Sequence, residues 1–191
     1  MPQMNKEKIV IGVAGMPGTG KSVVRQVVRE MDCSVVVMGD AIRLEAKKRK
    51  LRPTPENLGM VMLELRKEKG PTVVANRCVS KIQRSDKDVV VVDGIRSLDE
   101  VKAFRQHFPK FVLMAIHSSP RTRFERLFRR RRSDDPRGWD TFLERDLREL
   151  GVGLGNVIAT ADYMVVNEGT KKQFMIEIQE VLRDMIAKWE K

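Results

Sequence analysis

Five short apolar runs are spaced along the chain, and segments with a helical period separate them. The runs cover residues 9–14, 34–38, 89–93, 111–117 and 163–167. The third run is apolar on both faces, as a central strand of a parallel sheet requires. The last segment has the clearest helical face, formed by Phe174, Ile178, Val181, Leu182, Met185, Ile186 and Trp189. Alternating strands and helices predict an α/β fold, a three-layer sandwich with a five-stranded parallel sheet.

A glycine-rich phosphate-binding pattern, G-x-x-x-x-G-K-S, follows the first run. It consists of Gly15, Met16, Pro17, Gly18, Thr19, Gly20, Lys21 and Ser22, and a helix-compatible segment begins at Val23. A strand, a glycine turn and a helix start direct several backbone N–H groups at one anion. In such a loop Lys21 reaches the β- and γ-phosphates, and the Ser22 hydroxyl binds Mg²⁺. The pattern predicts a P-loop NTPase that binds ATP and Mg²⁺.

Composition and charge narrow the classes of function. The chain has 191 residues, of which 41% are hydrophobic, and this suits a single globular domain over 1–191. No apolar run approaches the ~20 residues of a membrane span, and residues 1–8 lack a secretory signal. We therefore expect a cytoplasmic protein without a membrane partner. Cys33 and Cys78 fit neither a disulfide framework nor a metal motif, so both are expected to be buried.

The net charge of +11 is concentrated in two stretches. Residues 40–52 contain six Lys or Arg and two acids, and residues 121–137 contain eight Arg and three acids. Such clustering predicts sites for anions.

Charged residues follow the predicted strands, at the edge where parallel sheets bind ligands. Asp93 ends a strand, the usual place of the acid that orients Mg²⁺; a turn or helix N-cap is the alternative. Arg96 is close enough to grip a phosphate in the same cleft. Asp40 and Arg43 are three residues apart at a helix start. Asp40 is a candidate base for a hydroxyl acceptor or a plain N-cap, and the two roles are compatible.

The second basic stretch predicts a lid over residues 120–150. Arg126 and Arg130 are four residues apart and share a helix face, where guanidinium groups stabilise the charge of a transferred phosphoryl group. Residues 133–136 break the helix, and a second helix follows over 139–150. The alternative is a solvated helix or a nucleic-acid patch. Nucleic acid is disfavoured because aromatic residues are only 5% of the chain and do not interleave with the basic run.

The order of these motifs resembles nucleoside monophosphate kinases, of which adenylate kinase and dephospho-CoA kinase are the nearest types. The order is P-loop, Gly-Asp-x-x-Arg, Asp-Gly-x-Arg, Arg-x-x-x-Arg and a late Asn-x-Gly loop. Over residues 9–181 the chain is similar to an archaeal family of predicted P-loop nucleotide kinases. The segments that carry this similarity are VMGD at 37–40, PTPENLG at 53–59, DGIRS at 93–97, RSDDP at 132–136 and ADYMVVNEG at 161–169.

The resemblance implies roles for residues outside the P-loop. It places Arg43 and Arg96 on the acceptor phosphate, Arg126 and Arg130 on the ATP phosphates, and Asn167 and Gly169 beside the ATP adenine. Arg145 resembles the arginine on the far arm of the lid, and we expect it to bind the acceptor as well. It also makes residues 40–85 a helical insert that binds the acceptor. The Ser22-Val23 pair departs from adenylate kinases and matches dephospho-CoA kinases, and the lid lacks the cysteines of zinc-containing adenylate kinases.

These features predict an ATP-dependent kinase whose partners are ATP and a small nucleotide-like acceptor. Lys21, Arg126, Arg130, Asp40 and Asp93 are the expected catalytic residues. Ser22 and Asp93 would hold the metal, and Asp40 joins the acceptor-binding arginines. The alternatives are a P-loop ATPase or nucleic-acid-associated regulator without a small acceptor, and a non-catalytic nucleotide sensor.

Overall fold

The computed structural model describes residues 7–132 and 135–189. Five parallel strands form one sheet in the order β2-β3-β1-β4-β5. The strands are β1 (Ile9–Ala14), β2 (Ser34–Val37), β3 (Val89–Asp93), β4 (Phe111–His117) and β5 (Tyr163–Val166). The predicted five-stranded parallel sheet is therefore confirmed, although β2 and β5 each end one residue earlier than expected.

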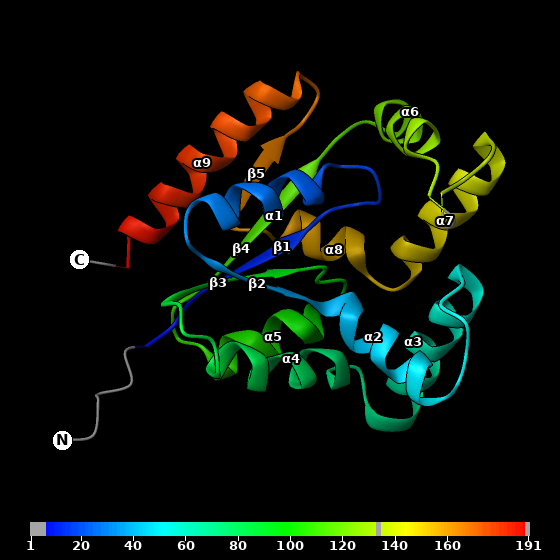
Figure 1. Cartoon of the computed structure of the whole chain (residues 1–191), viewed down its shortest axis with the longest axis horizontal. Coiled ribbons are helices and arrows are strands. Elements are labelled where there is room, and N and C mark those ends of the chain that lie inside the picture. Colours follow the sequence, from blue (N-terminus) through cyan, green and yellow to red (C-terminus); the bar gives the residue numbers. More distant parts are fainter. Residues whose placement is uncertain (1–6, 133–134, 190–191) are drawn as a thin grey trace.

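Helices cover both faces of this sheet (Figure 1). One face carries α1 (Lys21–Glu30) and α9 (Lys171–Ala187), and the other carries α4 (Val73–Gln83), α5 (Leu98–His107) and α8 (Leu154–Ala159). The three-layer arrangement is the one predicted. Because α9 ends at Ala187, the expectation that Trp189 belongs to its apolar face is wrong.

The residues of β1 show how the two layers are formed. Ile9, Ile11 and Val13 pack toward α1 and α9, whereas Val10 and Ala14 pack toward the opposite layer. All six residues of the strand are buried. Successive side chains of a strand point to opposite faces, so a continuous apolar run is what a strand covered on both sides requires.

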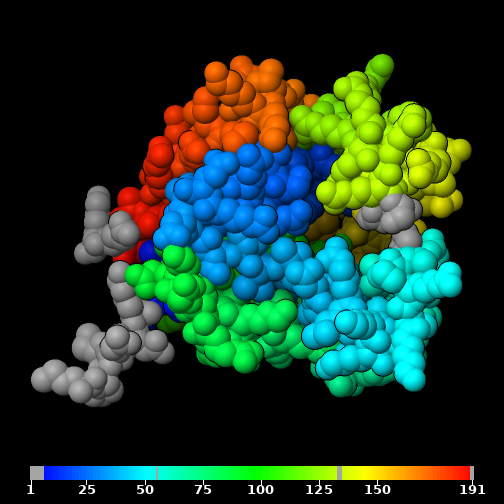
Figure 2. Space-filling model, in the orientation of Figure 1, coloured from blue at the N-terminus to red at the C-terminus, as the bar shows by residue number. Residues whose placement is uncertain are grey.

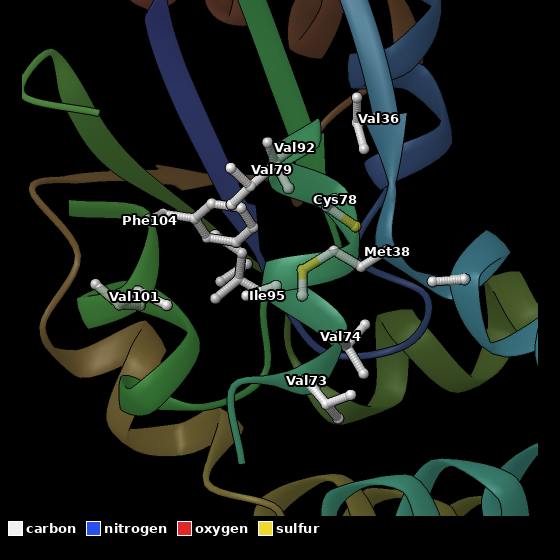
Figure 3. Packing of buried hydrophobic residues seen from close by; sticks show 14 of the residues in the cluster. Val36, Met38, Val73, Val74, Cys78, Val79, Val92, Ile95, Val101 and Phe104 are labelled. Atoms are coloured by element: carbon white, nitrogen blue, oxygen red, sulfur yellow. The ribbon is translucent and has the colours of Figure 1, made fainter. Parts of the chain in front are cut away.

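The core beneath the sheet includes one of the two cysteines. Figure 3 shows Cys78 among Met38, Val74 and Val92. Burial raises the pKa of the Cys78 thiol to about 11, so it stays protonated and packs as a small apolar side chain. Cys33 is only half-buried, and the expectation that both cysteines lie in the core is wrong for this residue.

Two helical segments lie at the carboxyl edge of the sheet, and the first of them ends in α4, which also covers one face of the sheet. The insert consists of α2 (Met38–Lys48), α3 (Pro55–Lys69) and α4, between β2 and β3. The lid segment consists of α6 (Pro120–Arg130) and α7 (Trp139–Gly151), between β4 and α8. Figure 2 shows the yellow-green lid segment facing the cyan part of the insert at one end of the molecule.

The starts of these helices test the capping predictions. Helix α2 begins at Met38, and Val37 is its N-cap without a side-chain hydrogen bond. Asp40 therefore lies inside the first turn, and its prediction as an N-cap is wrong. Helix α6 ends at Arg130, where Arg131 adopts a left-handed conformation with φ 52°. Of the predicted helix break at 133–136, Ser133 and Asp134 lie outside the described residues.

None of the helices in residues 7–132 and 135–189 has the length and apolarity needed to cross a bilayer.

Two glycines provide a matched test of this packing. A methyl group at Gly12, in β1, would lie 2.5 Å from Ile95 Cδ1 and 2.8 Å from Phe111 Cζ, whereas one at Gly59, in α3, would meet nothing within 4 Å. We expect Gly12→Ala to lower the free energy of unfolding by about 1–3 kcal/mol. Gly59→Ala should raise it by about 0.5–1 kcal/mol through helix propensity. Denaturant unfolding measures both, and a Gly12→Ala variant as stable as the wild type would contradict the packing described.

Candidate functional site

The sheet order brings the P-loop and Asp93 to one place. Strand β1 lies between β3 and β4, so the chain leaves it at a topological switch point, where open α/β sheets bind ligands. Asp93 is in register with Val13 and Val37 on the two neighbouring strands. A cavity of about 490 Å³, here called the P-loop cavity, opens at this edge between the P-loop, the insert and the lid segment.

The P-loop backbone has a conformation that glycine permits. Gly18 and Gly20 have φ of 89° and 103°, in the left-handed region. A Cβ at Gly18 would lie 2.8 Å from the carbonyl oxygen of Arg123, and one at Gly20 would collide with the side-chain amide of Asn167. That amide donates to the Thr19 carbonyl at 2.8 Å. The loop is thus braced from outside by a residue that follows β5.

Lys21 lies at the start of α1 and its ammonium group is held by the loop itself. It donates to the carbonyl oxygens of Gly15 and, at 3.1 Å, of Met16. Burial lowers the pKa of Lys21 from 10.5 to about 8; the Asp93 carboxylate opposes this shift and the charge of Arg96 adds to it. A phosphate anion in the cavity would raise this pKa again, because an opposite charge favours the ammonium form.

Asp93 is buried at the end of β3 and has one partner. Its Oδ2 accepts from Arg25 Nη1 at 2.5 Å, while its Oδ1 is buried and has no hydrogen-bond partner in the structure. Arg25 lies one helical turn after Ser22 on α1, and all three residues line the P-loop cavity. An orphaned carboxylate oxygen in a cavity that a serine also lines suits Mg²⁺ and its bound waters, so these residues fit the predicted metal.

The described residues contain no group of three His, Cys, Asp or Glu that could hold a metal by themselves.

The two predicted lid arginines both line the P-loop cavity. Arg126 donates to Ser118 Oγ and to the Asn167 carbonyl, each at 3.1 Å. Arg130 makes a bidentate pair with Asp135 at 2.9 and 2.5 Å. Burial alone would raise the pKa of Asp135, but hydrogen bonds from Arg130 and from the Arg132 backbone outweigh it and lower that pKa. Asp135 is therefore ionised, and its carboxylate is paired with the guanidinium of Arg130.

Arg123, in the same basic run, is buried instead of facing the cavity. Its guanidinium donates to both carboxylate oxygens of Asp146, at 2.8 and 2.5 Å, and to the carbonyl oxygens of Ser118 and Pro17. It also lies 5.0 Å from the centre of the Phe142 ring. This residue joins α6, α7 and the P-loop. Sequence reasoning did not distinguish it from its neighbours.

The predicted acceptor residues separate into two groups. Arg43, Arg96 and Arg145 line the P-loop cavity and also a neighbouring cavity of about 330 Å³ between α2, α3 and α7. Asp40 lines neither. It is exposed, 2.5 Å from Arg43 Nη1, and faces two other surface hollows. The structure thus brings the arginines together and leaves Asp40 outside.

Other predicted nucleotide-binding residues are similarly divided. Those that line the P-loop cavity are Pro17, Gly18, Gly20, Lys21, Ser22, Val23, Asn167 and Gly169. Gly15, Met16 and Thr19 belong to the same loop but do not line the cavity. Among the charged residues that line this cavity, sequence reasoning missed four, Arg25, Arg132, Glu149 and Lys171. Of these, Arg25 carried a signal, since it lies four residues after Lys21 and so shares its helix face.

The fold and site define a P-loop protein with a kinase-like fold. A family model described as an AAA domain matches residues 14–142. The chain is 54% identical over 175 residues to a UPF0200 protein of Hyperthermus butylicus, covering 92% of this chain and 94% of the relative. It is 46% identical to the UPF0200 protein MJ1399 of Methanocaldococcus jannaschii, covering 96% and 93%. The chain belongs to the UPF0200 family, and the expected similarity to an archaeal family of P-loop proteins is confirmed.

Solved structures with the same fold include two that are named as small-molecule kinases. TT1252 from Thermus thermophilus superposes with a TM-score of 0.64 at 17% identity, covering 94% of this chain and 98% of that one. Shikimate kinase from Bacteroides thetaiotaomicron has a TM-score of 0.60 at 15% identity, covering 92% and 98%. A gluconokinase from Sinorhizobium meliloti has 0.59 at 14%, covering 97% of both chains. At these identities the likeness establishes the fold alone.

The buried Arg123–Asp146 pair gives a direct test of how the lid segment is anchored. Arg123→Ala leaves the carboxylate of Asp146 buried without a counter-ion, so we expect the free energy of unfolding to fall by about 3–5 kcal/mol. Arg123→Ala combined with Asp146→Ala should recover part of this loss. Arg129→Ala, an exposed position on the same helix, should change stability by about 0.5 kcal/mol or less. Equal losses for Arg123→Ala and Arg129→Ala in denaturant unfolding would refute the anchoring role.

Proposed function

We propose that this protein is an ATP-dependent phosphotransferase that moves the γ-phosphoryl group of ATP onto a small nucleotide-like acceptor. The observation that carries the proposal is the shared wall between two cavities. The P-loop cavity is of a size for a nucleotide, and the neighbouring cavity of about 330 Å³ has room for a second small molecule. A donor and an acceptor held on either side of one cationic wall would be positioned for direct transfer.

On the donor side, the triphosphate would rest on the P-loop N–H groups and on Lys21. Asn167 and Gly169, which line the same cavity, would lie beside the adenine. Ser22 would ligate Mg²⁺ directly, and Asp93 would orient the ion through bound water. When bound, Mg²⁺ neutralises charge on the phosphates.

On the acceptor side, Arg96 and Arg145 would hold an anionic group of the acceptor against the γ-phosphorus. An acceptor oxygen forms the new P–O bond while the bond to the ADP leaving group breaks. Arg126 and Arg130 would stabilise the charge that spreads over the transferred group. An ionised phosphate acceptor needs no general base. This agrees with the position of Asp40, the predicted base, outside both cavities.

A screen of acceptors tests the proposal. ATP consumption should rise at least about tenfold with the right nucleotide-like acceptor, because a covered site excludes water as the attacking group. The panel should contain nucleoside monophosphates, dephospho-CoA, and shikimate and gluconate as hydroxyl acceptors. Lys21→Ala should abolish the stimulated rate while the protein remains folded. Rapid hydrolysis without an acceptor, increased by nucleic acid alone, would favour the ATPase or regulator instead.

The lowered pKa of Lys21 predicts how ATP binding depends on pH. Lys21 in the free protein loses its proton as the pH rises through about 8, whereas bound phosphates favour the protonated form. The Kd for a non-hydrolysable ATP analogue should therefore be flat below pH 7.5 and weaken above pH 8, by up to about tenfold per pH unit. Lys21→Arg, whose charge does not titrate in this range, should show no such break in calorimetric titrations. A flat profile for the wild type would contradict this role of Lys21.

A further inference from the structure

Among the residues that the structure describes, one acid lies in the wall between the two cavities. Arg43, Arg96, Arg145 and Glu149 line both cavities, so three cations and one carboxylate face the boundary where donor and acceptor would meet. The Oε2 of Glu149 lies 2.9 Å from Arg96 Nε, and the Glu149 side chain is 17% exposed. No sequence pattern indicated this residue.

Glu149 is presented by a rigid part of the lid segment. It lies on α7, one turn after Asp146, whose carboxylate is held by the buried Arg123. Arg123 also donates to the Pro17 carbonyl in the P-loop at 3.3 Å. The main chain that carries Glu149 is therefore anchored to the P-loop, and this fixes the position from which Glu149 reaches Arg96.

Arg96 is fixed from the opposite side. Its backbone N–H donates to Glu100 Oε2 at 2.8 Å, and Glu100 is fully buried. Arg66, on α3 of the insert, donates to the other oxygen of Glu100 at 2.5 Å. The main chain at Arg96 is thus held while its guanidinium is neutralised by Glu149. Glu149 lies at the Nε edge of this guanidinium, 2.9 Å away, while Nη1 donates to Met62 Sδ at 3.5 Å. A phosphate that pairs bidentately through Nε therefore has to displace the Glu149 carboxylate.

We propose that Glu149 determines acceptor specificity: its carboxylate occupies Arg96 in the empty site, and the anionic group of the acceptor must displace it. The inference rests on the proposed function. An acceptor with a single carboxylate would bind Arg96 about as strongly as the Glu149 carboxylate does, because both have one negative charge. Arg43 and Arg145 line the same wall, where Arg43 is paired with Asp40 and Arg145 lies 3.9 Å from Asp135. The second negative charge of a phosphate monoester adds attraction to all three arginines, so a dianion can displace the Glu149 carboxylate. The acceptor class is therefore a phosphate monoester rather than a carboxylic acid or a neutral alcohol.

Binding of simple anions tests this exchange without knowledge of the acceptor. Methyl phosphate and acetate are titrated calorimetrically into the full-length protein, with and without saturating Mg²⁺·ADP. Glu149→Gln should bind methyl phosphate about tenfold more tightly than the wild type and should gain measurable acetate binding. Glu149→Ala should show the same gain. Glu144→Gln, with the same charge change at an exposed position of α7 that lines neither cavity, should stay within about twofold of the wild type.

Adding Arg96→Gln to Glu149→Gln should remove the gain, which shows that it depends on Arg96. The proposal is overturned if Glu149→Gln binds methyl phosphate no more tightly than the wild type, if Glu144→Gln gains equally, or if the gain survives loss of Arg96. Wild-type binding of acetate as tight as that of methyl phosphate would also overturn it. Failure of ADP to bind would instead refute the proposed function, and the titrations without ADP would still decide the role of Glu149.

Discussion

The buried ion pair between Arg123 and Asp146 is the interaction on which the geometry of the cleft depends. It joins both lid helices, and its link to the Pro17 carbonyl ties them to the P-loop. Two charges removed from water are tolerated only when their hydrogen bonds are satisfied, and here the guanidinium also reaches the Ser118 carbonyl. Helix α7 therefore cannot swing away without leaving these charges unpaired. The inner part of the lid segment is a fixed wall, and Glu149 is positioned by it.

Three of the arginines that line the P-loop cavity are paired with carboxylates. Arg25 holds Asp93 and Arg96 holds Glu149, each across two different segments of the chain, whereas Arg130 holds Asp135, five residues further on. Anion binding at Arg96 or Arg130 is consequently an exchange of one anion for another, and its net free energy is the difference between two similar interactions. Such a site favours ligands with high charge density, because these gain more from the surrounding cations than a side-chain carboxylate does.

Local patterns predicted the fold and the position of the P-loop in it. Eight consecutive residues define the P-loop, and the valine-rich run that ends at Asp93 identifies a central strand without any knowledge of the partners. The predicted element boundary was wrong where the apolar pattern of a strand continued into the following helix. Met38 extends the apolar run of β2, so the helix was expected to begin later than it does, and Asp40 was mistaken for a possible N-cap. Long-range pairing was beyond reach: Arg123 differs from Arg126 only through Asp146, which lies 23 residues away from Arg123 along the chain.

The insert is held together by a separate network of ion pairs. Arg49 joins Glu45 on α2 to Glu64 on α3, and Arg77 on α4 also binds Glu45. These pairs make the three helices one unit, which Arg66 and Glu100 attach to the sheet beside Arg96. The lid segment is attached through Arg123 at the P-loop instead. The insert and the lid segment are thus attached to the rest of the protein at different places, and they face each other at the Arg96–Glu149 pair. In the proposed site, an anionic ligand could replace Glu149 at Arg96 without disturbing the packing inside either segment.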